Sequence, residues 1–318
     1  MLDGEISVRV LWAIGAIYAL LIVSSGIVAI LKRRSPGEGA QELARRVGSW
    51  WFMITIFTLA ILTNRIVSTV FLALVAFMAL KEYLSLIPTR RVDRIILLFA
   101  YWSIPLQFYF AHNDRYGLFL TFIPVWVFLF IPMAMTLMGK TEGFLRAVGT
   151  VSWGMMITVF ALSHTAMLLA VPAGEAGPAG GAGLLLFLVA LTQFNDVAQF
   201  TWGKLFGRRK IIPRVSPKKT WEGFLGGVVS TSALAALAGP YLTPMPHHYA
   251  ALAGVMIAIA GFLGDVTISA FKRDLGVKDS GGLIPGHGGI LDRVDSLTYA
   301  APVFYHAVHY FFFSGRLA

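Results

Sequence analysis

Apolar residues fill most of this chain in long blocks, each separated from the next by a short polar stretch. A membrane-spanning helix needs about 20 apolar residues, so blocks of this length predict spanning helices. We identify ten such segments, at residues 10–31, 50–64, 66–80, 95–111, 117–138, 148–171, 183–202, 223–242, 249–264 and 296–313. The pattern predicts an all-α, polytopic integral membrane bundle of about nine or ten transmembrane helices.

The second and third segments are short, and only Asn64 and Arg65 separate them. They predict either two short spans or one helical hairpin that does not fully cross the membrane. Nine spans therefore remain an alternative to ten.

The positions of lysine and arginine indicate the orientation of the bundle. With the N-terminus outside, the outer segments hold only Arg9, Arg65, Arg115 and Arg316, and the inner loops hold the other 22 of the 26 basic residues. Cytoplasmic loops of membrane proteins carry such an excess. We expect both termini outside, and we expect the loops at 203–222 and 265–295 on the cytoplasmic side. The net charge of +10 is then topological, and no nucleic-acid partner is expected.

Composition supports this class and excludes some chemistry. The chain is 57% hydrophobic and only 13% charged, whereas about a quarter of a soluble domain is charged. It has no cysteine, so disulfides, thiolate metal sites and cysteine nucleophiles are excluded. The first apolar block lacks a signal-peptide cleavage site, and the loops are too short to form a soluble domain.

The run GDVTISAFKRD, residues 264–274, carries the first candidate chemistry. If the ninth helix continues inward, Asp265, Ser269, Lys272 and Arg273 share one helical face. An acid could hold a metal there, and the hydroxyl and cations could hold phosphate oxygens. The alternative is a helix end whose charged side chains reach into the membrane interface. An ionisable residue at the edge of a span is nevertheless a functional candidate by default.

The run KDSGGLIPGHGGILDRVD, residues 278–295, is rich in glycine and charge. Its backbone N–H groups could form an anion-binding concavity around His287, or the run could be an ordinary loop. Asp292 and Asp295 could complement the dipole of the last helix. However, five aspartates fall within 31 residues at one membrane surface, and such oxygen donors suit Mg²⁺. Zinc is not expected, because the segment has no cysteine and no paired histidines.

The basic loop at 203–223 could supply the opposite charge. Contact with anionic headgroups, worth about 1 kcal/mol per basic residue, accounts for Arg208, Arg209 and Lys210. Ser216, Lys218 and Lys219 are better explained as ligands of a nucleotide triphosphate or a lipid phosphate.

Together these residues resemble a known family. The run SAFKRDLGVKDSGGLIPGHGGILDRVD, residues 269–295, fills every fixed position of S-x-x-K-R-x-x-x-x-K-D-x-G-x-x-x-P-G-H-G-G-x-x-D-R-x-D, the signature of the phosphatidate cytidylyltransferase (CDP-diacylglycerol synthase) family. The run VSPKKTWEG, residues 215–223, resembles a second hallmark of that family. We therefore divide the chain into N-terminal transmembrane helices, 1–182, and a catalytic region, 183–318. The resemblance covers roughly the last 40% of the chain.

One departure concerns Asp196, late in the seventh segment. In typical members this acid begins a pattern like D-x-x-A-Y. The corresponding run here is NDVAQF, residues 195–200, in which we interpret Gln199 as replacing the aromatic residue. This predicts a divergent subgroup whose lipid acceptor could differ.

The resemblance implies transfer of a cytidylyl group from CTP to phosphatidic acid, giving CDP-diacylglycerol and pyrophosphate in phospholipid biosynthesis. It also implies Mg²⁺, with a second cation such as K⁺ in some sites, a homodimer, and a cytoplasmic active site in the cell membrane. The implied site comprises catalytic Asp265, Lys272 and Asp292, metal ligands Asp265, Asp292, Asp196 and Asp295, and substrate-binding Ser216, Lys218, Lys219, Ser269, Arg273, His287 and Arg293.

Three other functions remain open. A CTP-dependent kinase of dolichol or another polyprenol would share the membrane, CTP and Mg²⁺, but would release CDP. A cytidylyltransferase could use a different lipid phosphate. A transporter of anionic solutes would usually place its charges near the bilayer midplane within repeated halves, and neither feature is visible here.

Overall fold

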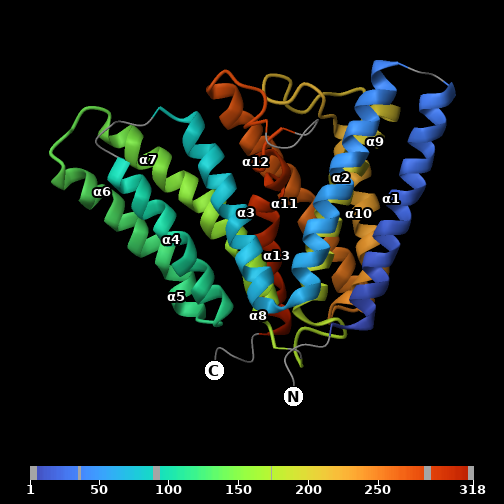
Figure 1. The fold of residues 1–318 in the computed structure, drawn as a ribbon, viewed down its shortest axis with the longest axis horizontal. Coiled ribbons are helices and arrows are strands. Elements are labelled where there is room, and N and C mark those ends of the chain that lie inside the picture. Colours follow the sequence, from blue (N-terminus) through green and yellow to red (C-terminus); the bar gives the residue numbers. More distant parts are fainter. Residues whose placement is uncertain (1–5, 35–36, 89–93, 173, 283–287, 314–318) are drawn as a thin grey trace.

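A computed structural model describes residues 6–34, 37–88, 94–172, 174–282 and 288–313, and within these ranges the chain is almost entirely helical (Figure 1). The helices are α1 (Val8–Arg34), α2 (Glu38–Thr63), α3 (Arg65–Leu86), α4 (Arg94–His112), α5 (Tyr116–Thr121), α6 (Phe128–Leu137), α7 (Phe144–Gly154), α8 (Ala161–Ala170), α9 (Gly180–Phe206), α10 (Trp221–Leu242), α11 (His247–Asp274), α12 (Leu291–Val294) and α13 (Leu297–Phe312), with π-helical stretches η2 (Phe122–Val127) and η3 (Met155–Phe160). The described residues include no strand, and Lys210 and Thr220 form an isolated antiparallel bridge. The predicted all-α membrane fold is confirmed.

Nine helical spans in the described ranges are long and apolar enough to cross a membrane. Two of them are composite, because α5, η2 and α6 run on as one span and α7, η3 and α8 as another. A tenth helix, α13, has 16 residues and packs beside α11 and α8. The start of α1 and the end of α13 lie at the same end of the bundle, as expected for an even number of crossings (Figure 1).

Helices α2 and α3 are longer than their apolar segments, because each continues through polar residues at one end. Asn64 separates them in an extended conformation, and its side-chain oxygen accepts a hydrogen bond from the backbone N–H of Val67. This cap satisfies one of the free donors at the start of α3. Their full length favours two complete spans over a short hairpin.

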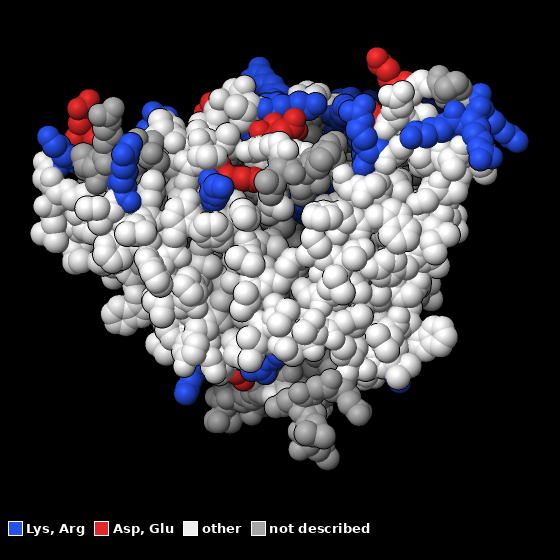
Figure 2. All heavy atoms as spheres, in the orientation of Figure 1, with Lys and Arg blue, Asp and Glu red and all other residues white. Residues whose placement is uncertain are grey.

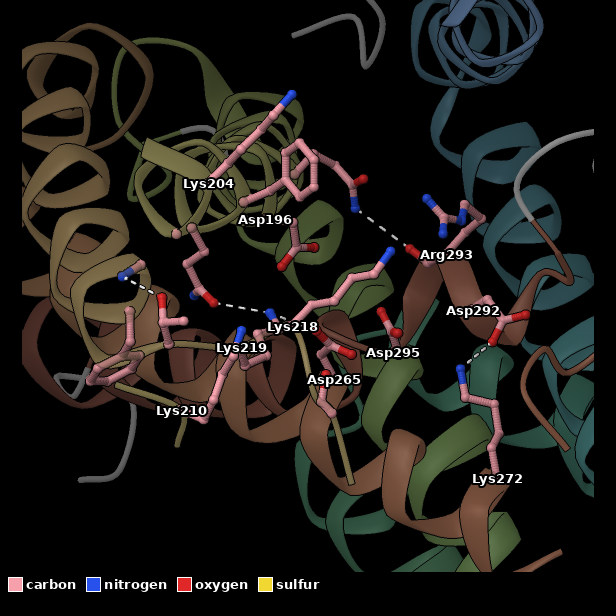
Figure 3. A pocket seen from close by; sticks show the side chains of 18 of the residues that line it. Asp196, Lys204, Lys210, Lys218, Lys219, Asp265, Lys272, Asp292, Arg293 and Asp295 are labelled. Carbon is pink, nitrogen blue, oxygen red and sulfur yellow. Dashed lines mark hydrogen bonds and ion pairs between the residues drawn. The ribbon is translucent and has the colours of Figure 1, made fainter. Parts of the chain in front are cut away.

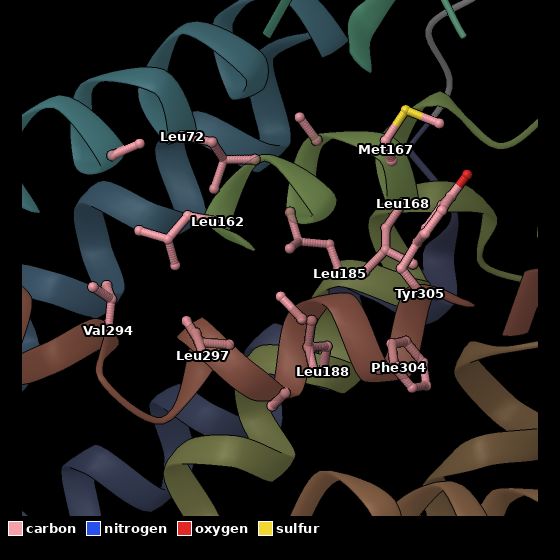
Figure 4. Close-up of a cluster of buried hydrophobic side chains, with 14 of the residues drawn as sticks. Leu72, Leu162, Met167, Leu168, Leu185, Leu188, Val294, Leu297, Phe304 and Tyr305 are labelled. Atoms are coloured by element: carbon pink, nitrogen blue, oxygen red, sulfur yellow. The ribbon is translucent and has the colours of Figure 1, made fainter. Parts of the chain in front are cut away.

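The core of the bundle is built around α8, in which all ten residues are buried. Leucine and aromatic side chains of α8, α9 and α13 pack together there, and Leu72 of α3 joins them (Figure 4). Helices from both sides of residue 182 share this core. The division into two functional regions therefore stays a prediction about chemistry.

Glycines let α9 and α10 pack closely beneath the predicted site. A Cβ at Gly223 would lie 2.7 Å from the backbone oxygen of Gln199, and a Cβ at Gly227 would lie 2.3 Å from its Cγ. Small residues four apart commonly allow such close approach in membrane helices. The α9–α10 pair thus fixes the position of Gln199.

Lysine and arginine gather at the end of the bundle where α1, α3, α6, α9 and α11 finish, which we call the basic end (Figure 2). The middle of the molecule presents almost no charge in this view. Arg9 and Arg65 lie at the opposite end, where they donate to backbone oxygens of Tyr241 and His112. The observed charge asymmetry matches the one counted along the chain.

Candidate active site

A cavity of about 590 Å³ lies at the basic end, enclosed by α9, the loop between α9 and α10, the end of α11, and α12 (Figure 3). Its volume falls within the range of about 300–1,000 Å³ typical of ligand sites. The lining combines acidic and basic side chains: Asp196, Asp265, Asp279, Asp292, Asp295, Lys204, Lys210, Lys218, Lys219, Lys272 and Arg293. Charges of both signs are therefore concentrated in one cavity.

The loop between α9 and α10 is fastened at its base. The Glu222 carboxylate accepts hydrogen bonds from the backbone N–H groups of Arg208, at 2.9 Å, and Arg209. Thr220 caps α10 by accepting from the N–H of Gly223. This cap ends the loop directly after Lys219 and places that side chain over the cavity.

Helix α11 continues past the predicted segment to Asp274, which meets the condition for a shared polar face, and this face reaches the cavity. Asp265 and Lys272 line the cavity, whereas Ser269 and Arg273 do not. The Ser269 hydroxyl donates to Asp265 Oδ1 at 3.3 Å. Arg273 donates to the backbone oxygens of Val215 and Val277, so in this structure it ties together two loops that border the cavity.

Lys219 occupies the middle of the acidic group. Its Nζ lies 2.7 Å from Asp265 Oδ2 and 3.0 Å from Gln199 Oε1. Burial lowers the pKa of this lysine, but the carboxylates of Asp265 and Asp196 outweigh burial and raise the pKa overall. Lys219 therefore stays protonated and neutralises the acids around it.

Lys272 and Asp292 form a second pair, joining α11 to α12 at 2.6 Å. Both residues are buried, with 8% and 7% of their surface exposed. Asp292 Oδ2 also accepts from the N–H groups of Ser280, at 2.8 Å, and Gly289, at 3.0 Å. A buried ion pair requires such additional hydrogen bonds to compensate for lost hydration.

The backbone conformation of residue 288 explains why the signature has glycine at this position. Its φ of +78° lies in the left-handed region, and a Cβ there would come within 2.5 Å of Asp292 Oδ2. Only glycine satisfies both conditions without strain.

Asp196 and Asp295 lie deeper among the acids. The Ser296 hydroxyl donates to the Asp196 carboxylate at 3.1 Å, and the Ser296 N–H donates to Asp295 Oδ1 at 2.8 Å. Burial, and then the nearby carboxylates of Asp265 and Asp196, raise the pKa of Asp295 well above its ordinary value. An added cation would relieve this repulsion.

The donor set fits Mg²⁺ only if substrate completes the coordination. Among the described residues, no three acidic or histidine side chains are arranged to hold an ion by themselves. Mg²⁺ commonly takes one or two carboxylates, and water and substrate phosphates supply its other ligands. Asp265, Asp292, Asp196 and Asp295 can provide carboxylates of this kind.

The structure thus brings together most of the predicted site. Nine predicted residues line the cavity: Asp196, Ser216, Lys218, Lys219, Asp265, Lys272, Asp292, Arg293 and Asp295. Ser269 and Arg273 stand behind it, and His287 lies outside the described residues.

Sequence reasoning missed other lining residues. Lys210 was assigned only to contact with anionic headgroups, and Lys204 was not singled out, although both border the cavity. Gln193 was not considered, and its position one helical turn before Asp196 was the available signal.

The interpretation of Gln199 needs a correction. The pattern D-x-x-A-Y, counted from Asp196, puts Gln199 at the alanine position and Phe200 at the aromatic position. Phe200 lines the cavity, and 58% of its surface is exposed. The departure is therefore a glutamine for an alanine, and the aromatic residue is retained.

Comparisons with known proteins point in one direction. The family model described as "Cytidylyltransferase family" matches residues 44–311. The Escherichia coli (strain K12) "Uncharacterized protein YnbB" is 45% identical over 298 residues, covering 94% of this chain and 98% of that protein. The "Phosphatidate cytidylyltransferase" proteins of Mycobacterium leprae and Haemophilus influenzae are 37% and 42% identical over 146 and 141 residues. These two alignments cover 46% and 43% of this chain, and 47% and 48% of those proteins.

Proposed function

The chain belongs to the cytidylyltransferase family, and we propose that it transfers a cytidylyl group from CTP to phosphatidic acid or a closely related lipid phosphate. A phosphate oxygen of the lipid attacks the α-phosphorus of CTP and forms a new P–O bond. The bond between the α-phosphorus and its bridging oxygen breaks, and pyrophosphate leaves. No covalent enzyme intermediate is needed, so catalysis rests on alignment and charge neutralisation.

The observation that carries this proposal is the position of the cavity. Its charged lining lies at the basic end of a membrane bundle, and the lining also includes the exposed, apolar side chain of Phe200. A water-soluble triphosphate can therefore enter from the aqueous side, while a lipid phosphate reaches the same cavity from the bilayer. We propose that this end faces the cytoplasm of the cell membrane, because basic residues gather there.

The two lysine–carboxylate pairs suggest how the lining accepts its substrates. Asp265 and Asp292 would hold Mg²⁺, which supplies positive charge at the phosphates when bound. Lys219 and Lys272, released from these carboxylates, would then bind phosphate oxygens. Lys218, Arg293 and Ser216 lie close enough in the lining to assist, and Asp196 and Asp295 are further candidates for Mg²⁺ or a second cation such as K⁺.

A labelled-nucleotide assay tests the reaction. Purified protein is incubated with Mg²⁺, CTP labelled at the α-phosphate, and one of three acceptors: phosphatidic acid, a polyprenyl phosphate or an unphosphorylated polyprenol. Label entering the lipid fraction with release of pyrophosphate supports the proposal. Label remaining in CDP, with γ-phosphate entering a polyprenol, would instead assign the chain to the lipid kinases.

The acceptor panel also decides which lipid phosphate is used. The expected homodimer stays a prediction, which mass measurement in detergent micelles would check.

A further inference from the structure

Glu82, near the end of α3, contacts the signature loop from the other half of the chain. Its Oε1 accepts a hydrogen bond from the N–H of Ile290 at 2.8 Å. Its Oε2 accepts from the N–H of Leu291 at 2.8 Å and from the Ser280 hydroxyl at 2.9 Å. One carboxylate thus binds both chain segments that flank the undescribed residues 283–287.

The same two segments hold Asp292. Ser280 donates through its backbone N–H to Asp292 and through its hydroxyl to Glu82. Of three successive amides, Gly289 donates to Asp292, whereas Ile290 and Leu291 donate to Glu82. Any displacement of Glu82 would therefore move the donors that orient the Asp292 carboxylate.

Glu82 itself is held firmly by the residue beside it. Tyr83 is almost fully buried and stacks on Phe271 of α11, with ring centroids 4.7 Å apart. Its hydroxyl donates to the backbone oxygen of Thr150 at 2.8 Å. Tyr83 thereby fixes the end of α3 against α11, the helix that also supplies Lys272.

Gly289 shows how tightly this contact is built. A Cβ at that position would lie 2.2 Å from Glu82 Oε2 and 2.4 Å from the Ser280 hydroxyl. The loop can approach the carboxylate only because residue 289 has no side chain.

We propose that Glu82 is a positioning residue for cytidylyl transfer, because it orients Asp292 through the backbone of residues 280 and 289–291. The inference rests on the proposed function and gives the N-terminal helices a part in the active site. Glu82 does not line the cavity, so it acts through the loop and touches no substrate.

Hydrogen–deuterium exchange tests the holding step without any assay of activity. Glu82→Gln keeps the shape of the side chain but presents an NH₂ group to one of the N–H donors. We expect exchange in peptides covering 288–294 to rise about tenfold or more, the factor for one hydrogen bond to a charged group. Exchange at 208–211 should stay unchanged. Conversely, Glu222→Gln should raise exchange at 208–211 and spare 288–294.

Kinetics test the consequence for Asp292. Glu82→Gln should lower kcat about tenfold or more and raise the Mg²⁺ concentration needed for half-maximal rate, with little change in the KM for CTP. Glu42→Gln is the matched control, since Glu42 lies at the same end of the bundle and, within the described ranges, forms an ion pair with Arg46 on a helix surface. If Glu82→Gln does not fold, Ser280→Ala removes one donor to Glu82 and keeps the N–H that binds Asp292.

The outcomes separate the two proposals. If the wild-type protein shows no CTP-dependent transfer, the proposed function fails, while the exchange data still decide whether Glu82 holds the loop. Unchanged exchange at 288–294 in folded Glu82→Gln overturns the inference. A lower melting temperature with wild-type kcat and Mg²⁺ dependence also overturns it, because that result describes a purely structural contact.

Discussion

Asp292 and Asp295 lie one helical turn apart but in opposite electrostatic environments. Burial opposes ionisation of Asp292, yet hydrogen bonds from Lys272 and Gly289 outweigh it and lower the pKa of that carboxyl. Burial and two neighbouring carboxylates raise the pKa of Asp295 instead. In the metal-free protein Lys272 neutralises Asp292, whereas the carboxylates around Asp295 leave it in an environment that favours an added cation.

This contrast predicts stability changes of opposite sign in metal-free protein. Asp292 has a lowered pKa, so it contributes stability above its unfolded pKa, and this is lost as pH falls through the folded value. Asp295 has a raised pKa, so stability falls as pH rises through that value. At neutral pH in EDTA, Asp292→Asn should cost about 3–5 kcal/mol, because it leaves Lys272 buried and unpaired. Asp295→Asn should raise the melting temperature.

Thermal unfolding of both variants in detergent, at neutral pH and at pH 4, checks these signs. The gain from Asp295→Asn should shrink at the lower pH, where the wild-type carboxyl already carries its proton. Arg208→Gln, an exposed substitution at the same end, should leave the melting temperature unchanged. A decrease for both aspartate variants would contradict the assigned environments.

The Asp265–Lys219 pair predicts a loss of activity rather than of fold. Asp265→Asn should abolish CTP-dependent transfer while the protein still inserts and elutes as a single species. Lys219→Met should lower kcat by about 10²–10³, the usual cost of removing a group that stabilises transition-state charge. Both rates are measured over a Mg²⁺ titration, and Arg208→Gln serves again as control. Near wild-type turnover in Asp265→Asn would refute its role as a metal ligand.

Much of this site could be predicted from the sequence because its signals are local. The face of α11 that carries Asp265 and Lys272 follows from helical periodicity, and the basic end follows from counting lysine and arginine. The partners could not be predicted in the same way. The sequence does not indicate that Lys219 pairs with Asp265 and Lys272 with Asp292. Asp265 and Asp292 are both aspartates, so either lysine could have paired with either acid.

Glu82 was missed for a different reason. Two of its three hydrogen-bond partners are backbone amides about 200 residues away, and an amide N–H carries no sequence signal. The same limit applies to Glu222, which binds amides of the α9–α10 loop. The division at residue 182 also gave no reason to search α3 for active-site residues.

Gln199 predicts a contact with substrate. Lys219 binds its oxygen, which fixes the orientation of the amide, and its Nε2 is buried without a partner among the described residues. A buried donor of this kind costs stability unless a ligand satisfies it. Because the exposed, apolar Phe200 follows it in the cavity lining, we expect Gln199→Met to raise the KM for the lipid phosphate about tenfold and to change the KM for CTP less. Steady-state kinetics with each substrate varied in turn decide this, and an unchanged lipid KM would contradict it.

Gln199→Ala, which restores the residue typical of the family, tests whether acceptor preference changes across the lipid panel.

The charge distribution predicts which end faces the cytoplasm, and the absence of cysteine makes this directly measurable. Arg208→Cys places a single thiol at the exposed basic end, and Arg115→Cys places one at the opposite end. Because positively charged ends are retained inside, we expect a membrane-impermeant maleimide to label intact cells only in Arg115→Cys. Inside-out vesicles should show the reverse pattern, and labelling after solubilisation controls for thiol accessibility. Labelling of Arg208→Cys in intact cells would place the cavity on the outer face, where CTP is not supplied by the cytoplasm, and would count against the proposed reaction.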